Sequence, residues 1–136
     1  MAEGKVLTGA GLRGQVAGKT ALSTVGKSGA GLTYRGYDVQ DLAENCQFEE
    51  VAYLIFFGEL PTAAQLTAYK AKLKSLRQLP QALKEVLERI PADSHPMDVM
   101  RTGVSMLGNL ETEQSFAEQQ DVADRILATL PAIICY

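Results

Sequence analysis

The spacing of apolar residues predicts a chain that is mostly helical after Gly36. Hydrophobic side chains recur there at intervals of three and four residues, which is the period of an amphipathic helix. Start and stop signals flank these stretches: Thr62 with Gln65 forms a capping box, Pro80 opens a further helix, and Pro91 ends it. The apolar faces are Leu66, Tyr69, Leu73 and Leu76; Leu83, Val86, Leu87 and Ile90; Met97, Met100, Val104 and Leu107; and Val122, Ile126, Leu127, Leu130, Ile133 and Ile134.

Two shorter helices are predicted earlier in the chain. Asp38 and Asp41 favour the start of a helix through Glu44, because a carboxylate there accepts from free backbone N–H groups and opposes the helix dipole. The next segment, residues 48–57, is apolar on nearly every side, and Gly58 can close it in the left-handed conformation. We therefore expect this helix to lie at the centre of the core.

The residues before Gly36 lack the helical period. Residues 21–25 and 31–35 are β-prone and are separated by a polar stretch that contains glycine, which predicts a small hairpin. Residues 1–20 are rich in Gly, Ala and Lys and are expected to form an extended arm. The sequence therefore predicts a mainly α fold, in which a helical domain over residues 21–136 carries a short N-terminal β-hairpin.

The last predicted helix reaches Tyr136 with no glycine, basic last turn or other stop signal. We therefore expect the polypeptide to continue beyond it. Later helices would then cover one apolar stripe of this helix, and without them the stripe would favour self-association. The stripe comprises Val122, Ile126, Leu130, Ile133 and Ile134.

Composition narrows the choice of compartment and partner. A net charge of −3 gives no reason to propose nucleic acid, which requires a clustered basic surface. The longest apolar run, residues 51–57, is far shorter than the roughly 20 residues that span a bilayer. Cys46 and Cys135 are too few for a disulfide framework or a zinc site, so we expect two buried, reduced thiols in the cytoplasm.

His95 is the single histidine of the chain. Acid–base catalysis usually needs at least two groups in register, so a lone histidine is a weak catalytic candidate. Its position just before Pro96, at the start of a predicted helix, is typical of a cap. One histidine also predicts no metal site. We therefore expect a structural role for His95 and identify no catalytic residue in this chain.

Basic residues gather on the helix predicted after residue 62. Lys70, Lys74 and Arg77 share one helical face, and Lys72 lies on another. No acidic residue occurs between Glu59 and Glu85. Such a surface could bind a polyanion such as a carboxylate or a phosphate, but most charged helix faces are simply solvated. Both interpretations remain open at this point.

Five segments, taken in order and at this spacing, resemble the citrate synthase family. They are TVGKSG, YRGYDVQDLA, FEEVAYL, GELP and HPMDVMRTGVSMLG, and the first of them, with the Cys-x-Phe-Glu-Glu-Val run, favours the methylcitrate branch. Members of the family are homodimers of two-domain, mostly helical subunits more than twice as long as this chain. The resemblance therefore implies that residues 21–136 are the N-terminal part of the large helical domain.

The resemblance also implies an activity for the whole protein. Family members condense an acyl-CoA with oxaloacetate, and the propionyl-CoA enzymes serve the methylcitrate cycle of propionate catabolism. The base and the two histidines that act in this reaction lie in segments absent here, so the chain alone is expected to be inactive. The acyl-CoA is a substrate, and neither a cofactor nor a metal is implied. The family's basic substrate contact in this region would correspond to Lys72, with Lys74 as a rival.

Two alternatives stay open at the level of sequence. The chain could belong to a citrate synthase of the tricarboxylic acid cycle, which would prefer acetyl-CoA. It could also be a stand-alone helical interaction module that binds a partner through its apolar last helix. A reading frame that continues past Tyr136 with a Gly-x-x-His-x-x-Ala-type segment would favour the enzyme.

Overall fold

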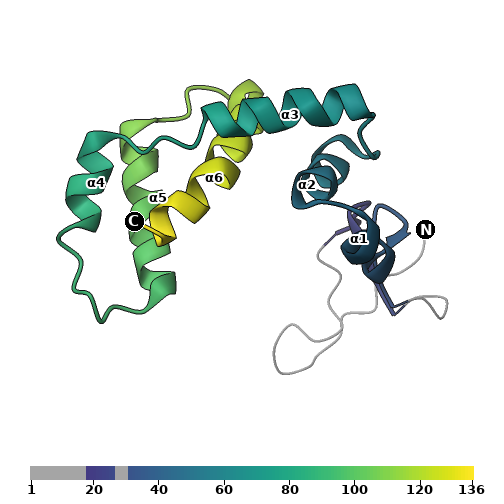
Figure 1. Cartoon of the computed structure of the whole chain (residues 1–136), viewed down its shortest axis with the longest axis horizontal. Helices are drawn as coiled ribbons and strands as arrows, with labels where there is room; N and C mark the ends of the chain where they lie inside the picture. The colour runs from purple at the N-terminus through teal and green to yellow at the C-terminus, as the bar shows by residue number, and fades with distance from the viewer. Residues whose placement is uncertain (1–17, 27–30) are drawn as a thin grey trace, which may run out of the picture.

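A computed structural model describes residues 18–26 and 31–136 (Figure 1). The predicted fold class is confirmed, because helices make up most of this part of the chain and a small sheet precedes them. Most of the expected N-terminal arm and the tip of the predicted hairpin lie outside the described residues. The elements are β1 (Ser23–Val25), β2 (Leu32–Tyr34), β3 (Tyr37–Asp38), α1 (Val39–Asn45), α2 (Phe48–Phe57), α3 (Ala63–Ser75), α4 (Gln81–Leu87), α5 (Pro96–Leu110), the 3₁₀ turn η1 (Phe116–Glu118) and α6 (Gln119–Ile134).

The sheet has three antiparallel strands in the order β1–β2–β3, one more than expected. Tyr34 pairs with Tyr37 across a two-residue turn, so β2 and β3 form a second hairpin. Both turn residues, Arg35 and Gly36, have positive φ (49° and 92°), as in the type I′ turns that join twisted strands. The Arg35 guanidinium donates through Nη2 to the Ile55 carbonyl of α2 at 2.8 Å, which ties the turn to a helix.

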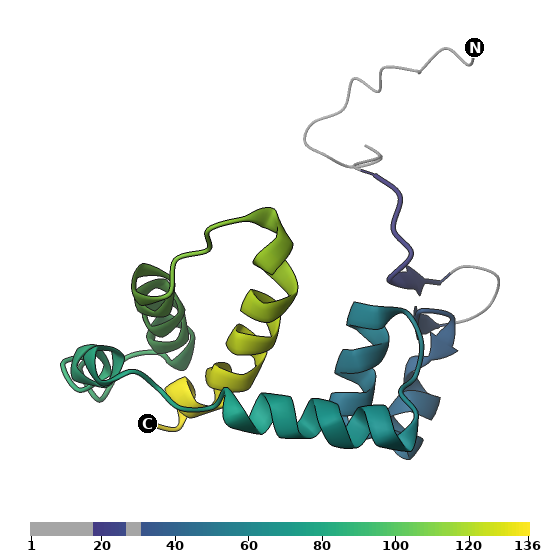
Figure 2. The same ribbon diagram turned by 90° about the horizontal axis from the view of Figure 1, so that it is seen from above.

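The helices are arranged in two groups that α3 connects (Figures 1 and 2). The sheet, α1 and α2 lie at one end of α3, and α4, α5 and α6 lie at the other end. Packing follows the same division, because α2 packs on α3, α3 packs on α6, and α5 packs between α4 and α6. The junction of α3 and α6 therefore holds the two groups together.

The helix boundaries follow the expected capping signals. Asp38 accepts from the Gln40 N–H at 2.8 Å at the start of α1, and Thr62 exchanges side-chain and backbone hydrogen bonds with Gln65 at the start of α3. Gly58 ends α2 with a φ of 91°, in the left-handed conformation that a glycine adopts without steric cost. These local predictions are confirmed because each depends on atoms close in sequence.

Two apolar clusters form the core, and neither is centred on α2. One joins α4, α5 and α6, and the other joins α3 to α6 with contributions from α2. The expectation that α2 lies at the centre is wrong: Leu54 is its single buried residue, and Phe48 at its start is 66% exposed. The buried members of the clusters are Leu83, Leu87, Leu107 and Ile133, and Tyr69, Leu73 and Ala128.

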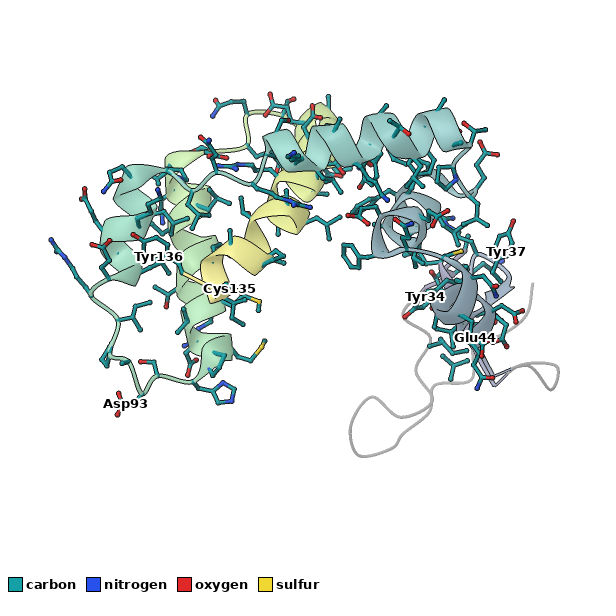
Figure 3. The ribbon with its side chains drawn as sticks, in the orientation of Figure 1. Tyr34, Tyr37, Glu44, Asp93, Cys135 and Tyr136 are labelled. Carbon is teal, nitrogen blue, oxygen red and sulfur yellow. The ribbon has the colours of Figure 1, made fainter. Side chains whose placement is uncertain are left out.

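The last helix and the cysteines also differ from expectation. Ile133 is 1% exposed and packs inside the first cluster, so the predicted open stripe on α6 is interrupted there, although Ile134 remains exposed. Cys46 is half-buried and Cys135 is exposed, so the prediction of two buried thiols is wrong (Figure 3). The sequence pattern placed both cysteines beside apolar residues, but both follow the last residue of a helix, where burial is incomplete.

Gly103 allows α5 and α6 to pack closely. A β-carbon at this position would lie 2.5 Å from Ile133 Cγ2, and the buried Ile133 side chain has little room to move. We expect Gly103→Ala to lower the free energy of unfolding by about 1–2 kcal/mol, since overpacking outweighs the gain in helix propensity. Denaturant unfolding measures this. Ile133→Ala in the same chain should relieve part of the loss, and fully additive effects would contradict the contact.

Candidate functional site

The junction of α3 and α6 contains a buried carboxylate. Asp124 of α6 is completely buried. Its Oδ1 accepts from the Tyr69 hydroxyl at 2.9 Å and from Gln120 Nε2 at 3.2 Å, and its Oδ2 accepts from Lys72 Nζ at 2.7 Å. A buried ionised group is costly unless it is paired and hydrogen-bonded, and here both oxygens are satisfied. The arrangement therefore supports a structural role for Asp124.

Lys72 is held between two acidic residues of α6. Its Nζ lies 2.8 Å from Asp121 Oδ1 and 2.7 Å from Asp124 Oδ2, and its side chain is 42% exposed. Hydrogen bonds to Asp121 and then to Asp124 raise the pKa of the Lys72 ammonium. Burial, with the hydrogen bond to Asp124, raises the pKa of the Tyr69 phenol. Lys72 is thus a fixed cation whose partners come from its own chain.

The other basic residues of α3 are in different surroundings. Lys74 is exposed, and no ion pair forms at it within the part of the chain that the structure describes. Lys70 donates from Nζ to the Gln47 side-chain carbonyl of α2. Arg77 is exposed and lines a hollow of about 430 Å³ that also includes Phe48. Of the two predicted substrate contacts, Lys74 therefore keeps a charge that an external anion could reach, and neither contact is tested by this geometry.

His95 caps α5, as the sequence suggested. Its Nδ1 accepts from the Met97 N–H at 3.2 Å, and Pro96 follows at the first helical position. The imidazole is exposed at this helix start. Among residues 18–26 and 31–136 there is no group of three or more His, Cys, Asp or Glu side chains that could hold a metal ion. No helix in the same residues is long and apolar enough to cross a membrane.

Arg125 connects three segments beside this junction. It forms a two-point ion pair with Glu111, in which Nε lies 2.8 Å from Oε2 and Nη2 lies 2.7 Å from Oε1. Its Nη1 donates to the Leu76 carbonyl and, at 2.9 Å, to the Gln78 carbonyl. Carbonyls at a helix C-terminus lack intrahelical partners, so this arginine satisfies the end of α3. Sequence analysis missed it because the partners lie 14 to 49 residues away.

The Arg125–Glu111 pair should make the free energy of unfolding depend on pH. The hydrogen bond from Arg125 lowers the pKa of the Glu111 carboxyl, so its contribution is full above the ordinary value of 4.5 and is lost as pH falls through the lowered value. We expect Glu111→Gln to lower the free energy of unfolding by about 1 kcal/mol at pH 7, a modest figure because Glu111 is 40% exposed. Urea unfolding at pH 7 and pH 3 checks this: the deficit should shrink at pH 3, whereas Glu113→Gln should change little at either pH.

A pocket of about 520 Å³ lies between α5 and α6, and Arg125 is among the residues that line it. We call it the α5–α6 pocket. Its lining is mostly apolar, and it also includes carboxylates from the end of α5 and the loop after it, from η1 and from α6. Pockets of this size with an apolar lining and a few polar groups are typical binding sites. Its lining is Leu76, Val104, Leu107, Gly108, Glu111, Thr112, Glu113, Glu118, Asp121, Val122, Arg125 and Ile126.

A comparison with known protein families shows which family the chain belongs to. The family model described as "Citrate synthase, C-terminal domain" matches residues 11–136. The chain belongs to the citrate synthase family. The sequence resemblance is thereby confirmed, and the family accounts for the order of the helices and the small sheet.

Individual relatives agree with this assignment. The chain is 77% identical over all of its 136 residues to a 2-methylcitrate synthase of Shewanella oneidensis, of which it covers 36%. It is 44% identical over 127 residues, 91% of its length, to 2-methylcitrate synthase 2 of Corynebacterium glutamicum, of which it covers 33%. The chain thus spans about a third of the length of these curated relatives.

Solved citrate synthases share the fold. The chain matches citrate synthase from Thermotoga maritima with a TM-score of 0.80 at 30% identity, over 93% of this chain and 33% of that one. It matches the ternary complex of carboxymethyl coenzyme A and oxaloacetate with citrate synthase from Thermoplasma acidophilum with a TM-score of 0.81 at 27% identity, over 90% and 33%. The helical arrangement described above is therefore that of a part of a citrate synthase.

Proposed function

We propose that this chain is the N-terminal part of a 2-methylcitrate synthase, which joins propionyl-CoA and oxaloacetate. In this reaction a carbon–carbon bond forms between the acyl α-carbon and the oxaloacetate carbonyl carbon. Water then cleaves the thioester, giving 2-methylcitrate and free CoA. The observation that carries the proposal is the 77% identity to the Shewanella oneidensis enzyme along the whole chain.

The choice of acyl-CoA is the finer part of this proposal. A citrate synthase from Mycolicibacterium smegmatis is 43% identical over 127 residues, close to the 44% of the second 2-methylcitrate synthase. Only the much higher identity to the first relative favours propionyl-CoA over the acetyl-CoA of a citrate synthase. Acetyl-CoA is therefore the alternative substrate. We further propose a homodimer that acts in the cytoplasm and contributes to propionate catabolism.

The helices of this chain supply a scaffold in the proposed enzyme. Lys72 is engaged with Asp121 and Asp124, so its charge fixes α3 against α6. The exposed Lys74 can still contact a substrate carboxylate or a CoA phosphate, and we retain it as the better placed of the two predicted contacts. The acid–base groups would come from the remaining two thirds of the polypeptide.

The proposed function can be tested with the protein that the complete reading frame containing this chain encodes. Its product should release CoA thiol from propionyl-CoA in the presence of oxaloacetate, and it should turn over propionyl-CoA with a higher kcat/KM than acetyl-CoA. A preference for acetyl-CoA would support the citrate synthase alternative. Absence of turnover with both substrates in a folded protein would contradict the proposal.

The 136-residue chain itself should be inactive. A base and two histidines that act as a unit cannot be replaced by His95, whose Nδ1 is occupied in capping α5. We expect no release of CoA thiol from propionyl-CoA and oxaloacetate above the buffer rate. A rate that disappears in His95→Ala would show that this histidine acts in catalysis after all.

A further inference from the structure

The hollow of about 430 Å³ that includes Phe48 and Arg77 is built from three parts of the chain. Phe48 and Glu49 come from the start of α2, Leu73 comes from α3 and Arg77 from the segment after it, and the other lining residues come from α6. Both α2 and α6 lie on the same side of α3 (Figures 1 and 2). We call this the α2–α3–α6 hollow. Its volume falls within the roughly 300–1,000 Å³ that is typical of small-molecule sites.

The lining of the hollow contains one charge of each sign. Arg77 is exposed and Glu49 is partly exposed, and both line the hollow. Neither forms an ion pair within residues 18–26 and 31–136, with each other or with another side chain. A guanidinium binds a carboxylate through two parallel hydrogen bonds, and a carboxylate accepts from an ammonium group. The hollow therefore has a free partner for an anionic group and a free partner for a cationic group.

The rest of the lining is mostly apolar. Leu73 and Ala128 are buried members of the second core cluster, so this part of the lining is firmly packed from behind. Phe48 is 66% exposed, so a large ring stands open to solvent in the hollow. Aromatic rings gain from burial and from edge-to-face or offset contact with a second ring. A ligand with a large apolar group would therefore cover surface that this chain leaves in water.

The backbone of α6 adds a hydrogen-bond acceptor to the hollow. Pro131 lies inside the helix and has no N–H, so the Leu127 carbonyl four residues earlier lacks its usual helical partner. Both residues line the hollow. A backbone carbonyl without such a partner remains available to an external donor. An ammonium group carries three N–H donors, enough for this carbonyl and for the Glu49 carboxylate.

We propose that the α2–α3–α6 hollow binds a free amino acid with a large apolar side chain. Arg77 holds its carboxylate, Glu49 and the Leu127 carbonyl accept from its ammonium group, and Phe48 packs against its side chain. A simple anion would leave Glu49 without a partner, and an uncharged apolar molecule would leave both charges without one. The zwitterion is the class of ligand that satisfies all of these groups. This site goes beyond the proposed condensation, because its ligand is neither of the two substrates.

Saturation-transfer NMR with L-phenylalanine tests the site, on the 136-residue chain and on the protein that the complete reading frame encodes. Three analogues each lack one feature: N-acetyl-L-phenylalanine has no cation, L-phenylalaninamide has no carboxylate, and L-alanine has no large side chain. We expect L-phenylalanine to bind both proteins and each analogue to bind about tenfold more weakly, the loss typical of one charge-assisted hydrogen bond or one buried side chain. Absence of binding, or equal binding of all four ligands, would overturn the proposal.

Variants of the lining assign each contact. Arg77→Gln and Glu49→Gln should each weaken binding of L-phenylalanine by about tenfold, and circular dichroism shows whether each variant is folded. Arg89→Gln, at an exposed arginine outside the hollow, is the matched control and should bind as the unaltered chain does. L-phenylalaninamide should bind the Arg77→Gln variant and the unaltered chain alike, because it has no carboxylate to lose. A further loss with this amide would contradict the role of Arg77.

Pro131→Ala separates binding from stability. An alanine N–H would restore the helical partner of the Leu127 carbonyl, so the Tm should rise while the affinity for L-phenylalanine falls. Loss of a merely structural feature would move the two readouts in the same direction. An unchanged affinity in this variant would show that the carbonyl does not accept from the ligand and would contradict that contact.

Two other outcomes would give the hollow a different occupant and overturn the proposal. Binding to the 136-residue chain without binding to the full-length protein would show that the rest of the polypeptide fills the hollow. Sedimentation could instead reveal a dimer of the 136-residue chain that Arg77→Gln dissociates, in which Arg77 of one copy meets Glu49 of the other. Release of CoA thiol by the full-length protein reports on the proposed function separately. A folded full-length protein that binds L-phenylalanine without turnover would support the site and contradict only that function.

Discussion

Lys72→Met should lower the free energy of unfolding by about 2–4 kcal/mol. The substitution leaves the completely buried Asp124 carboxylate without a cation, and breaking a buried pair in this way typically costs ~3–5 kcal/mol. We place the expected loss somewhat lower because Lys72 is partly exposed and Tyr69 and Gln120 still donate to Asp124. Chemical denaturation of the 136-residue chain at pH 7 gives the value.

Lys74→Met is the matched control, two residues away on the same helix. Lys74 is exposed, so its loss should change the free energy by less than about 0.5 kcal/mol. Asp124→Asn in the Lys72→Met background should recover part of the stability, because an amide oxygen can still accept from Tyr69 without a buried charge. Equal effects of the two lysine variants would show that the junction does not depend on the ion pair.

Leu54→Ala should destabilise the chain by about 2–5 kcal/mol through the cavity it leaves. Leu54 is 0% exposed to solvent, whereas the other residues of α2 are only partly buried or are exposed. The loss is expected because this leucine is the buried anchor of its helix. Urea unfolding, with the slope checked against the unaltered chain, measures the effect.

Phe48→Ala provides the comparison within the same helix. Phenylalanine is larger than leucine, but the Phe48 side chain is 66% exposed, so its truncation removes little buried area. We expect a loss of less than about 1 kcal/mol. If Phe48→Ala cost more than Leu54→Ala, the assignment of burial along α2 would be wrong.

Sequence reasoning predicted the helices well because their signals are local. The capping box at Thr62, the glycine at position 58 and the cap at His95 each involve residues two to four apart. Burial was predicted less well. The pattern of residues 48–57 shows that the segment is apolar, but it does not show how much of α2 other elements cover.

The buried Asp124 at the α3–α6 junction is the main feature that was not predicted from the sequence. Tyr69 and Asp124 are 55 residues apart, and no short-range pattern links them. A signal was nevertheless present, because Asp124 lies three and four residues before Leu127 and Ala128 and therefore on the inward face of α6. A charged residue on an apolar face indicates a buried partner. The partner itself could only be identified once the helices were placed.

Arg35 has a consequence for the order in which the chain folds. A non-glycine residue at positive φ costs roughly 1–2 kcal/mol, and here a hydrogen bond to Ile55, 20 residues later, offsets that cost. The β2–β3 turn therefore gains its support only after α2 has formed and docked. A hairpin that depends on a later helix is a poor nucleus, so the transition state for folding should contain α2 with α3 before it contains the sheet.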